Sequence, residues 1–96
     1  MRFLITVHMS TEVSNAVVRD GRIGPVLQSA LERLKPEAAY FGPHEGGRTA
    51  FIVCNLDDVS QIPAISEPFF QELGARVEFI PVMNAEDLAR GVAAIT

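Results

Sequence analysis

The alternation of hydrophobic and polar residues predicts a strand at the start of the chain. Between residues 3 and 9 every second side chain is large and apolar, and a period of two is typical of a strand with one buried face. Apolar residues then recur at helical spacing over about 11–20 and 25–35. Ser10 and Thr11 offer hydroxyls that can cap the first of these helices, and Pro25 suits the first turn of the second.

The middle of the chain predicts two further strands. A short strand over 38–41 is followed by a turn over 42–47, which contains three glycines. The next strand runs from about 48 to 56. Its segment 50–54 is apolar at every position, which is typical of a strand in the centre of a sheet.

A helix over about 58–73 follows that strand. The pair Asp57-Asp58 can cap its beginning, and Gly74 ends it. Pro63 falls in its first turn, where a missing N–H costs little. Pro68 lies further in, so we expect it to kink or divide the helix.

The last strand, about 75–83, contains Pro81, which cannot donate to a strand ladder and therefore predicts an edge position. Asn84 can cap a final helix over about 85–94. The order βαββαβ plus a C-terminal helix predicts a ferredoxin-like α+β fold with a four-stranded antiparallel sheet. Residues 1–96 form a single domain on this interpretation.

Right-handed crossovers place both main helices on one face of this sheet, which leaves the other face uncovered. That face is too apolar for water, because a monomer rarely exposes a hydrophobic patch of more than a few hundred Å². We therefore predict a homodimer in which two sheets pack face to face. By parity, the strands other than the apolar third one supply this face with Leu4, Thr6, His8, Tyr40, Glu78, Ile80 and Val82.

Several segments resemble uncharacterised small proteins of the dimeric α/β-barrel superfamily, which are grouped near muconolactone isomerase-like domains. The resemblance is one of pattern and is carried by residues 36–41, 47–48, 51–53, 68–69 and 77–82. It implies two ferredoxin-like units whose sheets form a barrel. Members of the superfamily include small isomerases, cofactor-free monooxygenases, haem enzymes and stress-response proteins, so the resemblance implies a fold far more than a chemistry. No catalytic residue is carried over from it.

Composition narrows the classes of partner. Eight basic residues face twelve acidic ones, for a net charge of -4, which argues against a nucleic-acid partner. No apolar stretch approaches the ~20 residues of a membrane span, and we expect a cytoplasmic protein without a membrane partner. The one cysteine, Cys54, lies in an apolar run and is interpreted as a small buried hydrophobe.

Three residues of the uncovered face are candidates for chemistry. His8 can transfer a proton near neutral pH, and the simpler alternative is a rim histidine bonded to a main-chain carbonyl. Tyr40 can donate to an oxyanion or simply line a wall. Glu78 has apolar neighbours that favour a raised pKa, or else it is a solvated charge paired with Arg76 or with an arginine of the other subunit. If the first and third strands run side by side in parallel, Asn55 lies near His8 and orients it; the alternative is that Asn55 simply caps the following helix.

Other clusters favour structural roles. His44 and Arg48 flank the glycine-rich turn, but no helix follows the glycines, so a hairpin is favoured over an anion site. His8 and His44 lack the spacing of metal ligands with Glu45, so no metal and no cofactor is expected. Haem binding is a third and weaker alternative, because neither histidine is convincingly placed as an axial ligand.

Two functions from different classes follow. In the first, a cavity between the sheets binds or converts a small apolar organic molecule by proton transfer without a cofactor, with His8, Tyr40 and Glu78 as its polar groups. In the second, side chains fill the dimer interface and the protein is a non-catalytic assembly module. The residues expected to fill that interface are Leu4, Ile52, Ile80 and Val82.

Overall fold

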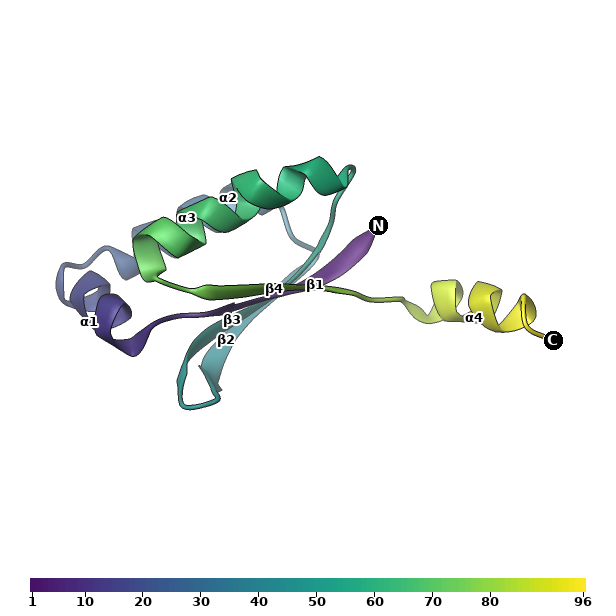
Figure 1. Ribbon diagram of the computed structural model, residues 1–96, viewed down its shortest axis with the longest axis horizontal. Coiled ribbons are helices and arrows are strands. Elements are labelled where there is room, and N and C mark those ends of the chain that lie inside the picture. Colours follow the sequence, from purple (N-terminus) through teal and green to yellow (C-terminus); the bar gives the residue numbers. More distant parts are fainter.

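The computed structural model describes residues 1–96 and confirms the predicted ferredoxin-like arrangement (Figure 1). The helix predicted over about 58–73 begins with a separate 3-10 turn. Its elements in chain order are β1 (Arg2–His8), α1 (Thr11–Arg19), α2 (Ile23–Leu34), β2 (Ala38–His44), β3 (Gly47–Asn55), a 3-10 turn (Val59–Gln61), α3 (Ile62–Leu73), β4 (Arg76–Pro81) and α4 (Ala85–Ala93). No helix is both long and apolar enough to cross a membrane.

The sheet has the strand order β2-β3-β1-β4, and all neighbouring strands are antiparallel. Helices α2 and α3 lie over one face, and α1 packs beside α3 (Figure 1). The odd-numbered residues of β1 point toward the helices, so Ile5, opposite Ile52 and Phe79, lies at the centre of the core. The core is completed mainly by apolar side chains from α1, α3 and β3, including Val17, Ala50, Cys54, Phe69 and Leu73.

The opposite side of the sheet, which we call the open face, has no helix over it. Its side chains alternate with the core residues along each strand, as predicted for β1 from the period of two. They include Leu4, Thr6, His8, Tyr40, Phe51, Val53, Glu78 and Ile80. In the single chain, Leu4, Phe51 and Val53 remain half-buried, and Ile80 is exposed. The expectation that Ile52 fills an interface on this side is wrong, because Ile52 lies opposite Ile5 and is buried in the core.

Helix ends follow the predicted capping residues. The Ser10 hydroxyl accepts from the Val13 N–H, and the Asp58 carboxylate accepts from the Ser60 N–H. Gly74 ends α3 in the left-handed region, at φ 55°. The predicted division of this helix is wrong, because α3 continues through Pro68. The buried side chain of Phe69, in the next position, anchors this turn to the core and outweighs the hydrogen bond that proline removes.

The turn between β2 and β3 is tighter than the predicted segment 42–47. Only two residues form it, and both have positive φ: Glu45 at 52° and Gly46 at 75°. Gly42 instead lies within β2, and His44 and Gly47 face each other as the last pair of the ladder. The hairpin prediction is confirmed, but its strands extend further than composition indicated.

β4 is an edge strand, as the proline predicted. The Val82 N–H donates to the Arg2 carbonyl at 3.1 Å, and Pro81 lies opposite Phe3. Because inward and outward N–H groups alternate along an antiparallel strand, the nitrogen of Pro81 faces away from β1. The proline therefore removes no hydrogen bond from the sheet.

The last helix, α4, extends away from the rest of the molecule (Figure 1). Asn84 and Asp87 form the predicted cap reciprocally: each side chain accepts from the backbone N–H of the other. No residue of α4 is buried. Its attachment to the body includes an ion pair between Arg2 Nη1 and Asp87 Oδ2 at 3.2 Å.

Candidate functional site

Polar side chains gather at one end of the open face, beside the β2–β3 turn. They surround a hollow of about 150 Å³, which we call the His8 hollow. The register explains the grouping, because His8 lies directly opposite Thr49 on one side and Arg76 on the other. The lining residues are Thr6, His8, His44, Glu45, Thr49, Arg76, Glu78 and Ile80.

His8 is half-buried, and its Nε2 atom is buried without a hydrogen-bond partner. The ring packs against the backbone of Gly47, where a Cβ atom would lie only 2.9 Å from Nε2. Glycine therefore makes room for this ring position. Buried polar atoms are normally paired, so this ring nitrogen keeps one unused hydrogen bond, which a molecule in the hollow can use once the ring turns away from Gly47.

An ion pair closes the rim of the hollow. Arg76 Nη2 donates to Glu45 Oε2 at 2.9 Å, and this hydrogen bond and the charge of Arg76 hold the pKa of the Glu45 carboxyl below its usual range. His44 Nε2 lies 3.9 Å from the other Glu45 oxygen. Arg76, at the start of β4, thus pairs with Glu45 in the β2–β3 turn. It does not pair with Glu78, which was one of the alternatives for that residue.

The structure brings two of the three candidate residues together. Glu78 lines the same hollow as His8, although it is exposed, and it lies opposite Thr6 on the edge strand. Tyr40 is 72% exposed and does not line the hollow. Tyr40 and Glu78 occupy the two edges of the sheet, which are separated by three strand spacings or roughly 14 Å.

The prediction that Asn55 orients His8 is wrong. β1 and β3 are antiparallel, so Asn55 lies opposite Arg2, while His8 lies opposite Thr49 at the other end of the ladder. In a ferredoxin-like sheet these two strands are central neighbours of opposite direction. Their carboxyl ends therefore lie at opposite ends of the ladder that joins them.

His44 and Arg48 do not form a pair, because their side chains lie on different faces. The guanidinium of Arg48 points to the helix side, where Nη1 donates to Ser14 Oγ at 2.7 Å and to Asn15 Oδ1 at 2.9 Å. His44 meets the ring of Phe51 edge-on, with 5.5 Å between the centroids. A predicted turn of only two residues, Glu45 and Gly46, would have placed His44 and Arg48 on opposite faces of the sheet by strand parity.

Sequence reasoning missed Thr49 as a residue of this site. Its side chain is buried, and Oγ1 donates to the Gly47 carbonyl at 3.1 Å, which ties the strand to the turn beneath His8. The signal that could have found it is the register: with a two-residue turn, counting positions along β3 aligns Thr49 with Gly42 and thus places it on the open face.

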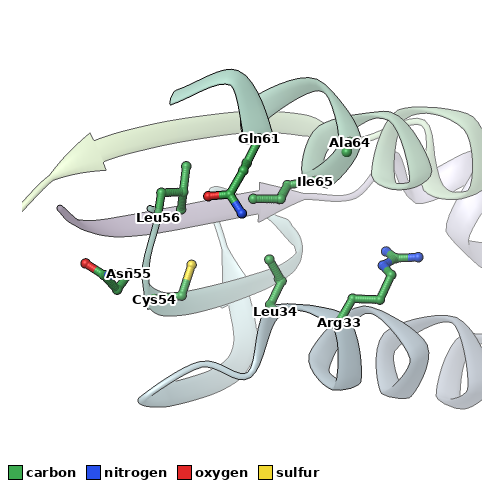
Figure 2. A pocket seen from close by; sticks show the side chains of 8 residues that line it. All are labelled: Arg33, Leu34, Cys54, Asn55, Leu56, Gln61, Ala64 and Ile65. Carbon is green, nitrogen blue, oxygen red and sulfur yellow. The ribbon is translucent and has the colours of Figure 1, made fainter. Parts of the chain in front are cut away.

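A second hollow lies between the end of β3 and the helices α2 and α3 (Figure 2). It measures about 240 Å³, and the side chains of Cys54 and Gln61 point into it (Figure 2). Cys54 is buried, as predicted, and burial raises the pKa of its thiol, so the reactive thiolate is disfavoured. Gln61 already accepts from the backbone N–H groups of Asp57 and Asp58. This hollow therefore offers no activated nucleophile.

Comparison with curated proteins and with solved structures finds no match to the sequence. A family match does exist, and it extends over the whole chain, residues 1–96. The chain belongs to the family described as a domain of unknown function, DUF3303.

Proposed function

We propose that the open face is one half of a small-molecule site, which a second copy of the chain completes. The ligand is a small organic molecule with an apolar body and one polar group. His8 transfers a proton to or from that polar group, and no cofactor takes part. The unpaired Nε2 atom of His8, buried beside the hollow, is the observation that carries this proposal.

The size of the hollow supports a shared site. Ligand pockets usually measure about 300–1,000 Å³, and the His8 hollow holds only about 150 Å³. Next to it, the open face carries the apolar side chains of Leu4, Phe51, Val53 and Ile80, which a second sheet would cover. Covering this surface would enclose the hollow and exclude water from it. The resemblance to the dimeric α/β-barrel superfamily agrees with such a pairing.

The remaining candidates take secondary roles in this proposal. Glu78 can relay the proton, because it lines the same hollow as His8. Tyr40 lies at the other edge of the sheet, so it lines the enclosed space as a wall or donates its hydroxyl from there. The pair of Glu45 and Arg76 holds the turn in position at the rim.

Saturation-transfer NMR with a panel of phenols, cyclic enones and small lactones tests the proposal. We expect at least one compound class to bind the wild-type protein and to lose binding in His8→Ala. The control variant, Gln28→Ala, changes an exposed side chain of α2 on the other side of the sheet and should bind as wild type does. Equal binding by His8→Ala and the control would contradict a role for His8.

The apolar side chains of the open face also favour the second function, an assembly module without a ligand. In that case the half-buried Leu4, Phe51 and Val53 fill the interface between two sheets and leave no cavity. A crystal structure of the dimer separates the two functions. An enclosed space lined by His8 supports the binding site, whereas a solid interface supports the assembly module.

A further inference from the structure

The end of the chain carries a hydrophobic surface that its own fold does not cover. Leu88, Val92 and Ile95 are 51%, 45% and 83% exposed. Leu88 and Val92 lie four residues apart on one side of α4, and Ile95 follows three residues later, in the turn after the helix. We call this set the α4 stripe. A helix of nine residues is marginal in water by itself, so α4 needs a surface against which the stripe can pack.

We propose that the α4 stripe packs against a second copy of this chain, each copy receiving the helix of the other. The inference rests on the proposed pairing of open faces and adds a second contact region to it. The α4 helix extends away from the end of β4, and the sheet and the other helices lie on the opposite side of this connection (Figure 1). The helices α1 to α3 therefore do not reach the stripe.

The root of α4 is continuous with the open face. Arg2, which belongs to the open-face side of β1, holds Asp87 in the first turn of the helix. Leu4 and Ile80, the next pair along the sheet, are apolar. A second copy seated on the open face is thus brought next to α4 without any rearrangement of the chain.

The areas also favour a combined interface. Four strands and about six residues per strand give a flat footprint of roughly 400 Å². A helix of nine residues, about 13 Å long and 10 Å wide, enlarges the footprint by about one third. The α4 helix therefore adds substantially to the area that the open face alone offers to a second copy.

The charges of α4 argue against a lipid surface. Its only charged residues are Glu86, Asp87 and Arg90, so the polar side carries a net negative charge. Helices that lie on membranes usually carry lysine and arginine on their polar side. An apolar stripe on a helix with acidic residues in its first turn suits contact with a protein surface better than contact with a lipid surface.

Sedimentation equilibrium on two adjacent substitutions tests the inference. Val92→Lys puts a charge into the stripe, and Ala93→Lys puts the same charge 100° around the same helix. Both residues are exposed and outside the core, so neither change unfolds the subunit. Because each dimer buries two copies of Val92, we expect Val92→Lys to weaken dimerisation by about 100-fold. Ala93→Lys should leave it within a few-fold of wild type.

A third variant, Ile80→Lys, separates this inference from the proposed function, because it charges the open face and leaves α4 unchanged. If Ile80→Lys dissociates the dimer and Val92→Lys does not, the role of α4 is overturned and the pairing of open faces stands. A wild-type protein that stays monomeric overturns both. In mixed labelled and unlabelled samples, filtered NOEs from the Val92 methyl groups to another copy support the inference, whereas contacts only within one copy overturn it.

Discussion

Replacing Gly47 by alanine tests how the ring of His8 is positioned. A Cβ atom at this position would lie 2.9 Å from His8 Nε2 and 3.0 Å from Cε1. Both distances are shorter than ordinary van der Waals contact, so the ring must rotate or the strands must separate. Overpacking of this kind costs about 1–3 kcal/mol, and an off-rotamer imidazole costs about 0.5–1.5 kcal/mol. We expect Gly47→Ala to lower the free energy of unfolding by about 1 kcal/mol.

Gly42→Ala is the matched control. Gly42 lies on the neighbouring strand of the same hairpin and the same face, and a Cβ atom there meets nothing within 4 Å. Because alanine restricts the unfolded chain, this variant should be neutral or stabilised by up to about 1 kcal/mol. For a domain of this size, 1 kcal/mol moves the melting temperature by about 4–8 °C.

Urea denaturation at one fixed protein concentration gives the free energies, and imidazole chemical shifts report the His8 ring. In a His8→Ala background the clash is absent, so the added cost of Gly47→Ala should vanish in a double-mutant cycle. Two results would refute the reasoning: equal stabilities for the two glycine variants, or a Gly47→Ala cost that persists without the His8 ring.

Three further changes address the core, the link between sheet and helix, and the capping of α4. Leu73→Ala removes a fully buried side chain of α3 and should cost about 2–5 kcal/mol in urea denaturation; a loss below about 1 kcal/mol would contradict the assigned core. Arg48→Met deprives the buried Ser14 hydroxyl of its donor and should cost about 1–3 kcal/mol, most of which Ser14→Ala should restore in the double variant. The pKa of Asp87 is lowered chiefly by the Asn84 N–H, so its capping contribution is present above the unfolded carboxyl pKa of about 3.9 and disappears as pH falls through the lower folded value. A carboxyl ¹³C titration should therefore give a midpoint below about 3.9, and a midpoint at or above that value would oppose the assigned cap.

Local chemistry made the order of elements predictable. The period of two in residues 3–9 fixed which side of β1 meets the helices, and the residues Ser10, Gly74 and Asn84 marked helix ends because each supplies a specific backbone interaction. These features depend on neighbours in the chain, which a sequence displays directly.

The candidate site was predicted less completely, because it depends on pairing between distant segments. The turn at Glu45 and Gly46 is two residues long, and that length decides which face each residue of β2 and β3 occupies. Because the length of the turn was not known, the sequence did not predict that Thr49 belongs to the site or that Glu45 pairs with Arg76. The direction of β1 relative to β3 likewise decided that Asn55 lies far from His8.

The outward-facing nitrogen of Pro81 has a consequence for how copies of this protein meet. A strand arriving at the free rim of β4 finds no donor at that residue, and the charged side chains of Glu78 and Arg76 border the same rim. Addition of strand after strand, the route to fibrils, is therefore discouraged along β4. Open-ended polymers that grow by strand addition at β4 are therefore disfavoured, whereas oligomers of fixed size that form through the face of the sheet are not affected.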